Sequence, residues 1–91
     1  MAARRVIVEG RVQGVGFRYA VKDLARGFDV CGWVRNLDDG TVEIQMMGEG
    51  HELDSFLREI SQESSVAHHI QKLTSSIIEP MRNVTGFTIT R

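Results

Sequence analysis

The feature that most constrains this fold is residues 10–18, where the spacing of apolar residues changes from that of a strand to that of a helix. An apolar run over residues 6–8, together with Val12, indicates a strand over residues 4–12. The residues that follow carry the i, i+3, i+4, i+7 stripe of an amphipathic helix: Phe17, Ala20, Val21, Leu24, Ala25 and Phe28. We expect Gly27 to end this helix. A helix with one apolar stripe must bury it, and a neighbouring sheet provides the surface.

The turn between this strand and helix has features of an anion-binding site. Gly14 and Gly16 readily adopt left-handed backbone angles and carry no Cβ, so neighbouring N–H groups can point into one concavity. A helix that begins at about Phe17 directs its unpaired first-turn N–H groups to the same place. Arg18 adds planar donors that match phosphate oxygens. Taken alone, these residues fit either an anion site or a tight turn with a solvated arginine.

The middle of the chain predicts a hairpin followed by a second helix. Period-two alternation indicates strands over residues 30–37 and 41–47, and residues 38–40 (Asp-Asp-Gly) form the turn between them. Because the turn is short, the two strands are expected to pair antiparallel. A second helical stripe then consists of Leu53, Phe56, Leu57 and Ile60.

The end of the chain predicts two further strands. One is expected over residues 67–78, with a β-bulge because its apolar residues Ile70 and Leu73 lie three positions apart. A short strand over residues 86–90 is expected as the last element of the chain. The predicted fold class is α+β: a ferredoxin-like split βαββαβ sandwich, with two helices on one face of a mainly antiparallel sheet and a short final strand. The length is that of a single domain, residues 1–91, with a shallow site.

Two blocks of the sequence resemble the paired signature of the acylphosphatases. The first block is Gly10-Arg11-Val12-Gln13-Gly14-Val15-Gly16-Phe17-Arg18-Tyr19. The second block is Gly32-Trp33-Val34-Arg35-Asn36-Leu37-Asp38-Asp39-Gly40-Thr41-Val42-Glu43. A shorter match returns at Gly86-Phe87-Thr88-Ile89.

The resemblance implies a hydrolase that cleaves the carboxyl-phosphate anhydride of acyl phosphates into a carboxylate and inorganic phosphate, without a cofactor. It implies that Arg18 binds the phosphate and that Asn36 positions the attacking water. The phosphate-binding loop would consist of Gln13, Gly14, Val15, Gly16, Phe17 and Arg18. Judged by its neighbours alone, Asn36 also fits a turn residue. Family members often carry Gly-Pro in the loop before the fourth strand, and residues 61–66 lack it.

Charge and hydropathy limit the partners of this chain. Its net charge is −1, with 11 Lys and Arg scattered among 12 Asp and Glu, which disfavours nucleic acid. We expect no membrane segment and no leader peptide, because no apolar run has the required length, and we expect a cytoplasmic location. The expected partners are a small-molecule acyl phosphate and inorganic phosphate, which is both product and inhibitor. We expect a monomer.

We expect no metal site. His68 and His69 are adjacent, and on a strand they would face opposite sides, while His51 is remote in sequence. Arg18 and backbone N–H groups can supply the positive field without a metal. The chain has one cysteine, Cys31, which is better interpreted as a small strand residue than as a nucleophile, because no activating base lies near it in sequence.

Other polar and aromatic residues have ordinary interpretations. Asp38 and Asp39 are more typical of a turn than of acid-base catalysis. Trp33 and Tyr19 suit either the core or the rim of a site. The rival function is a binding module, since the same sandwich serves RNA-binding and regulatory domains. The expected first and third strands carry no aromatic residue for base stacking, but a domain that binds phosphate without turnover remains the alternative.

Overall fold

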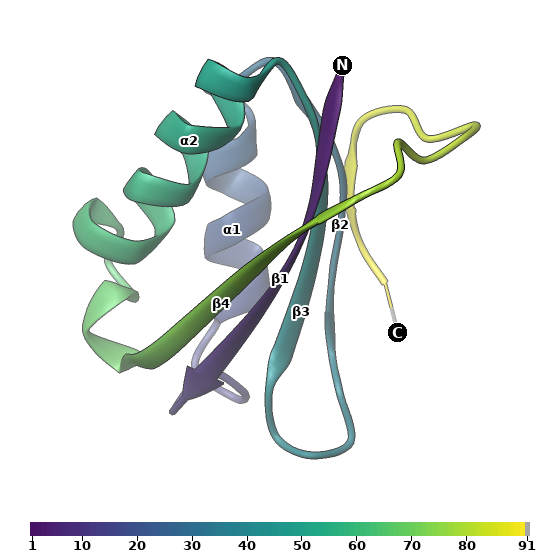
Figure 1. The fold of residues 1–91 in the computed structure, drawn as a ribbon. Coiled ribbons are helices and arrows are strands. Elements are labelled where there is room, and N and C mark those ends of the chain that lie inside the picture. The colour runs from purple at the N-terminus through teal and green to yellow at the C-terminus, as the bar shows by residue number, and fades with distance from the viewer. Residues whose placement is uncertain (91) are drawn as a thin grey trace.

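The computed structural model describes residues 1–90 as a five-stranded sheet with the helices packed on one face (Figure 1). The strands are β1 Ala2–Gly10, β2 Val30–Asn36, β3 Val42–Gly48, β4 Ile70–Ile78 and β5 Phe87–Ile89. Their order in the sheet is β4-β1-β3-β2-β5. Neighbouring strands are antiparallel except β2 and β5, which are parallel. The parallel strands β1 and β2 are therefore split by β3, as in the predicted ferredoxin-like α+β sandwich.

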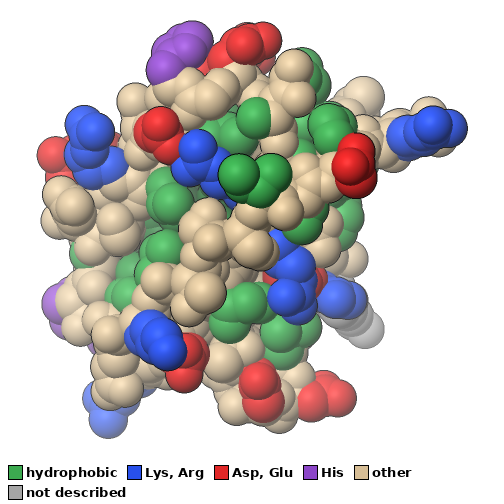
Figure 2. Space-filling view, in the orientation of Figure 1, with side chains coloured by type: hydrophobic (Ala, Val, Ile, Leu, Met, Phe, Trp, Pro, Cys, Tyr) green, Lys and Arg blue, Asp and Glu red, His purple; other side chains and the backbone are tan. Residues whose placement is uncertain are grey.

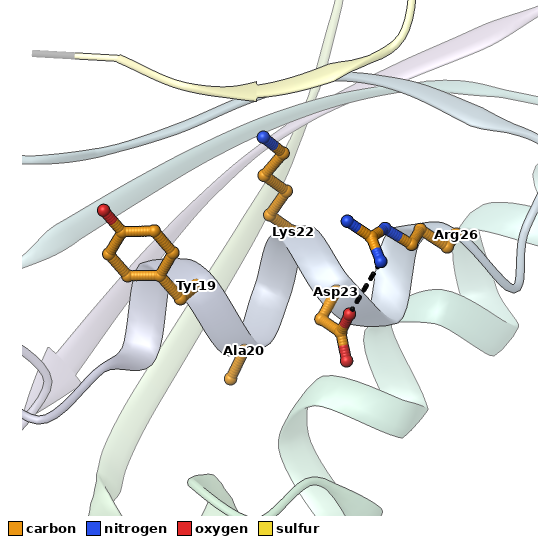
Figure 3. Close-up of a pocket in the computed structure, with 5 residues that line it drawn as sticks. All are labelled: Tyr19, Ala20, Lys22, Asp23 and Arg26. Atoms are coloured by element: carbon orange, nitrogen blue, oxygen red, sulfur yellow. Dashed lines mark ion pairs between the residues drawn. The ribbon is translucent and has the colours of Figure 1, made fainter.

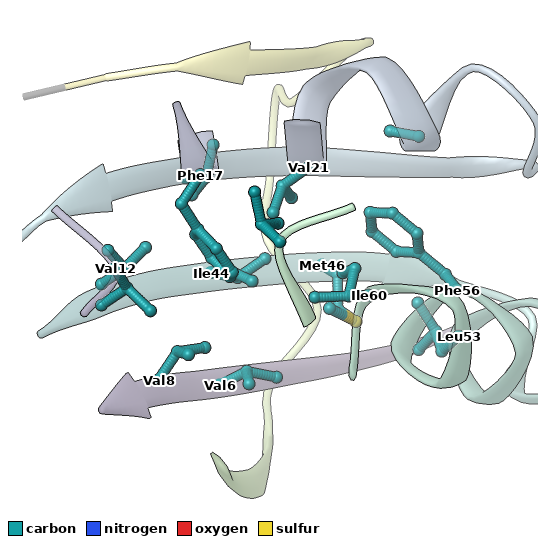
Figure 4. Packing of buried hydrophobic residues seen from close by; sticks show 14 residues of the cluster. Val6, Val8, Val12, Phe17, Val21, Ile44, Met46, Leu53, Phe56 and Ile60 are labelled. Carbon is teal, nitrogen blue, oxygen red and sulfur yellow. The ribbon is translucent and has the colours of Figure 1, made fainter. Parts of the chain in front are cut away.

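The core lies between the sheet and the helices α1 Phe17–Ala25 and α2 Gly50–Arg58. A π-helical turn, Glu59–Glu63, extends α2. In Figure 4, helix side chains such as Phe17 and Phe56 lie between the two layers. They meet side chains from alternate residues of the strands, such as Val6 and Val8. The fully buried residues of this cluster include Val6, Val8, Val12, Phe17, Val21, Val34, Val42, Ile44, Met46, Leu53, Phe56 and Ile60. Burial of each large aliphatic or aromatic side chain stabilises the fold by about 1.5 to 3 kcal/mol.

The other face of the sheet carries no helix among residues 1–90 (Figure 1). On β3, Val42 and Ile44 are buried against the helices, and Glu43 between them points to the opposite face. Glu43 is nevertheless only 1% exposed, because it is ion-paired to Arg5 and Arg35 from the two flanking strands. Figure 2 shows Lys and Arg side chains gathered beside hydrophobic ones on this side of the molecule.

The first strand ends earlier than predicted. A strand was expected over residues 4–12, but β1 ends at Gly10, and Val12 is buried beyond it. At Gly10 the backbone has a φ of 137°, and a Cβ atom there would lie 2.2 Å from the carbonyl oxygen of His69. The N–H of Arg11 donates to the same carbonyl at 3.0 Å. This contact with a remote segment takes the chain out of the sheet and begins the loop.

The fourth strand begins later than predicted, and the predicted bulge is present. A strand was expected over residues 67–78, but Ala67–His69 form a 3₁₀ turn and β4 begins at Ile70. The register of β4 against β1 skips Gln71. This irregularity lets both Ile70 and Leu73 pack against the core, which the three-residue spacing required.

The first helix is shorter than its apolar stripe. It ends at Ala25, and the N–H of Gly27 donates to the carbonyl of Leu24 in the final turn. Phe28, the last residue of the stripe, lies beyond the helix. Its ring packs on Phe56 with the ring centroids 5.4 Å apart, so it contributes to the core from the following loop.

Candidate active site

The loop between β1 and α1 has the backbone of an open anion cradle. Gly14 and Gly16 have φ values of 79° and 80°, which non-glycine residues rarely adopt. Apart from the adjoining residues, no atom of residues 1–90 lies within 4 Å of where a Cβ would stand on either glycine, so these positions need glycine for its backbone angles. Gly16 is also the N-cap of α1, and no side chain of residues 1–90 caps this helix start. The first-turn N–H groups are thus left for an external acceptor.

Side chains of the loop anchor it and leave its backbone exposed. Phe17 is 1% exposed within the core, and Val15 packs against the same cluster. The side-chain amide of Gln13 donates to the carbonyl of Leu37 at 2.8 Å and to that of Thr41 at 2.9 Å. These two bonds tie the loop to the β2–β3 hairpin. The side chain of Gln13 is therefore occupied by hydrogen bonds within the protein. Only the backbone N–H of Gln13 is left to bind phosphate.

The hairpin that Gln13 holds begins directly after Asn36, the last residue of β2. Asn36 pairs with Val42 of β3, on the strand face that Gly32 and Val34 also occupy. Its Oδ1 atom is buried and has no hydrogen-bond partner within residues 1–90. A buried acceptor left unpaired costs about 1 to 3 kcal/mol. Such an atom at a glycine loop is well suited to hold a water or a substrate group.

Arg18 stands in the first turn of α1, directly after the cradle. Its side chain is partly buried, and it forms no ion pair with any residue of the described part of the chain. The guanidinium therefore keeps its planar donors for an anion. The structure thus brings the glycine loop and the hairpin after Asn36 together through Gln13, and places Arg18 at the end of the same loop.

The remaining candidates have structural roles. Asp39 accepts hydrogen bonds from the N–H and hydroxyl of Thr41, and these bonds lower the pKa of its carboxyl group. The hairpin turn is completed by Gly40, which has a φ of 91°. Burial and the nearby charge of Asp29 raise the pKa of the Cys31 thiol, which favours the unreactive protonated form.

The arrangement expected for the adjacent histidines is wrong. His68 and His69 lie in the 3₁₀ turn instead of a strand, and their ring centroids are 4.0 Å apart in a tilted stack. Within residues 1–90 no three His, Cys, Asp or Glu side chains are grouped as metal ligands would be. The structure also places the two aromatic residues that the sequence left open. Tyr19 is 71% exposed on α1, and Trp33 is partly buried on the sheet face without helices.

A hollow of about 500 Å³ lies along α1 (Figure 3). It is lined by Tyr19, Ala20, Lys22, Asp23 and Arg26. Asp23 and Arg26 form a surface ion pair at 3.4 Å across one turn of the helix. Neither the glycine loop nor Asn36 lines this hollow, so it is separate from the candidate site.

Among the helices of residues 1–90, none combines the length and apolar character needed to span a bilayer.

Comparison with known proteins identifies the family. The acylphosphatase family model matches residues 4–89. An acylphosphatase of Bacillus licheniformis is 45% identical over 87 residues, which cover 96% of this chain and 92% of that protein. The crystal structure of an acylphosphatase from Bacillus subtilis superposes with a TM-score of 0.87 at 35% identity, with full coverage of both chains. The structure of HypF from T. kodakarensis gives a TM-score of 0.85 at 27% identity, covering all of this chain and 12% of that one. This chain belongs to the acylphosphatase family.

Proposed function

We propose that this protein hydrolyses acyl phosphates, breaking the carboxyl-phosphate anhydride bond to release a carboxylate and inorganic phosphate. The observation that carries the proposal is the buried Oδ1 atom of Asn36, which has no hydrogen-bond partner within residues 1–90. Asn36 directly precedes Leu37, the residue to which Gln13 ties the glycine loop. The names of its relatives support the same reaction. A loop that offers N–H groups to an anion, next to an acceptor that can hold water, is suited to a hydrolytic attack on phosphorus.

In the proposed mechanism the phosphoryl oxygens are bound by backbone N–H groups of residues 13–18 and by the guanidinium of Arg18. A water donates a hydrogen bond to Oδ1 of Asn36 and attacks phosphorus in line with the leaving oxygen. The phosphorus–oxygen bond to the acyl group breaks, and the carboxylate leaves without general acid catalysis because it is a weak base. The proton of the attacking water passes to a phosphoryl oxygen of the substrate.

In this mechanism the protein mainly positions the water and the phosphoryl group and stabilises the phosphoryl charge. Arg18 and the first-turn N–H groups of α1 offset the phosphoryl charge, so we propose that turnover needs no metal ion. Inorganic phosphate carries the same oxygens as the substrate and should therefore compete with it. All of the groups invoked lie on the one chain, which suits a monomeric single-domain enzyme.

The deciding experiment is hydrolysis of benzoyl phosphate by the purified chain, followed as phosphate release. We expect turnover well above the spontaneous rate, and loss of turnover in the folded Asn36→Ala variant. The competing function is phosphate binding without turnover. The similarity of this chain to a segment of the much longer HypF chain is compatible with that alternative. Saturable binding of inorganic phosphate with no acceleration of hydrolysis would establish that alternative.

A further inference from the structure

The sheet face without helices holds a group of charged residues that the reaction does not use. The carboxylate of Glu43 accepts a hydrogen bond from Nε of Arg5 on one oxygen and from Nε of Arg35, at 2.6 Å, on the other. Burial alone raises the pKa of this carboxyl group, but the two arginine hydrogen bonds and charges outweigh burial and lower it. Glu43 is therefore ionised at neutral pH, and the group of three retains one positive charge in excess.

That excess charge is accessible to a ligand. The side chains of Arg5 and Arg35 are 42% and 39% exposed. Within residues 1–90, each guanidinium donates to Glu43 through its Nε–H group alone, so the terminal amines keep their donors. A guanidinium that is held at Nε by a buried carboxylate presents these amines in a fixed direction. The arrangement loses little entropy when an anion binds.

An aromatic ring and two hydroxyl groups stand beside Arg35. Trp33 and Arg35 are two residues apart on β2 and share the open face. Trp33 is paired in register with Thr88 of β5, and the N–H of Thr90 donates to the carbonyl of Val34, which places Thr90 next to Arg35. These four side chains line a hollow of about 370 Å³. Its volume is within the range of about 300 to 1,000 Å³ typical of small-molecule sites.

We propose that this hollow binds a flat organic anion, an aromatic ring or base that carries a carboxylate or phosphate, at a site separate from the glycine loop. The ring stacks on Trp33, the anionic group accepts hydrogen bonds from the terminal amines of Arg35, and the hydroxyls of Thr88 and Thr90 donate to the remaining acceptor sites of the same group. Asn36 follows Arg35 on β2 but points to the opposite face of the sheet, so the two sites do not share side chains.

Trp33 is the only tryptophan of the chain, so its fluorescence reports directly on this hollow. The test titrates the Arg18→Ala variant, in which the loop is deprived of its arginine, with benzoate and separately with adenosine monophosphate. We expect saturable quenching by at least one of them below about 10 mM, the weak end of ligand affinity. Quenching by benzoate alone assigns an aromatic carboxylate, and quenching by the nucleotide alone assigns an aromatic phosphate. The non-aromatic cyclohexanecarboxylate should bind at least about tenfold more weakly, because it cannot stack.

Matched variants separate this site from general charge effects. Arg35→Gln should weaken binding by about tenfold or more, and Arg35→Lys by less, since a lysine keeps the charge but loses the planar donors. Arg58→Gln removes one positive charge from an exposed position of α2 and should leave binding unchanged. The double variant Thr88→Val, Thr90→Val keeps the shape of β5 and should weaken binding by about three- to tenfold through two lost hydrogen bonds.

Three results would overturn the proposal. The first is the absence of saturable quenching by both anions. The second is equal binding of benzoate and cyclohexanecarboxylate. The third is unchanged affinity in both the folded Arg35→Gln variant and the double threonine variant. The threonine variant decides the matter if Arg35→Gln does not fold, because Thr88 and Thr90 make no side-chain hydrogen bond within residues 1–90.

Discussion

Arg18 and Asn36 have different chemical roles in the proposed site, and single substitutions should separate them. Arg18 ends the glycine loop with its guanidinium unpaired in the described chain, whereas Asn36 presents a buried acceptor at the end of β2. A cation of this kind binds the phosphoryl group in both the ground state and the transition state. The acceptor acts on the water alone. The two variants should therefore differ in phosphate affinity even where both lose turnover.

We expect Arg18→Ala to lower kcat by about 10³ or more and to weaken inhibition by inorganic phosphate, in line with other arginines in phosphoryl transfer. Asn36→Ala should lower kcat by roughly 10² to 10³, as for the loss of one well-placed polar group, with phosphate inhibition retained. The measurements are kcat and the competitive inhibition constant of phosphate for each folded variant. Lys22→Ala, one turn further along α1, controls for the loss of one charge. Equal loss of phosphate binding in both variants would assign Asn36 to the anion cradle instead.

Glu43 should contribute pH-dependent stability. Its pKa is raised by burial but lowered further by Arg5 and Arg35, so its folded-state value lies below its usual one. The ionised carboxylate then stabilises the fold above the unfolded pKa of about 4.3, and this contribution is lost as the pH falls through the folded pKa. Glu43→Gln should cost about 1 to 2 kcal/mol at pH 7, less than a fully buried pair because both arginines are partly exposed.

The measurement is urea unfolding of both proteins at pH 7 and at acidic pH. The difference between wild type and Glu43→Gln should shrink as the pH falls through the lowered pKa of Glu43 in the folded protein, because the wild-type carboxylate then becomes protonated. A difference that stays constant over this range would mean that the ion pairs contribute nothing and that the substitution acts through packing.

At the scale of secondary-structure elements, the start of α1 depends on a glycine in the left-handed conformation. Gly16 has a φ of 80°, and a Cβ there would have no atom of the described chain within 4 Å beyond its two neighbours in sequence. Gly16→Ala should therefore destabilise the protein by about 1 to 2 kcal/mol, entirely through backbone strain. It should also lower kcat, because relief of that strain turns loop N–H groups away from the anion.

Gly50→Ala provides the matched control. Gly50 begins α2, its Cβ would also stand in open space, and its φ is not in the left-handed range. Alanine there should be neutral or stabilise by up to about 1 kcal/mol. The measurement is the free energy of unfolding in urea of the Gly16→Ala and Gly50→Ala variants. Equal effects of the two substitutions would show that backbone strain at Gly16 is not the cause.

At the scale of the whole molecule, the positive field of the site comes from backbone and guanidinium groups. In the described part of the chain, the start of α1 has no side-chain cap and its first turn has no acidic residue, so neither of them cancels that field. We expect exhaustive treatment with EDTA to leave kcat and KM for benzoyl phosphate unchanged, since Arg18 and loop N–H groups already offset the phosphoryl charge. The measurement compares treated enzyme before and after addition of Mg²⁺ or Zn²⁺. Activity lost to the chelator and restored by a divalent ion would require a metal in the mechanism.

The amino-acid sequence alone determined the features that depend on neighbours within a few residues. The apolar stripes of α1 and α2 predicted both helices, strand alternation placed Glu43 opposite Val42 and Ile44, and Gly40 predicted the hairpin turn. The bulge of β4 followed from its three-residue apolar spacing. The order of these elements was enough to predict the sandwich, because amphipathic helices must cover one sheet face. The motif resemblance, not the spacing, supplied the roles of Arg18 and Asn36.

Tertiary structure decided the features that join segments remote in sequence. The carbonyl of His69 ends β1 at Gly10, and Gln13 bonds carbonyls 24 and 28 residues away. Arg5 meets Glu43 across 38 residues. Each of these polar groups has many possible hydrogen-bond partners in the unfolded chain, and its actual partners are set only when the strands of the sheet pair. The oxygen of Asn36 that has no partner within residues 1–90 is likewise a property of the folded chain, since only folding removes it from solvent.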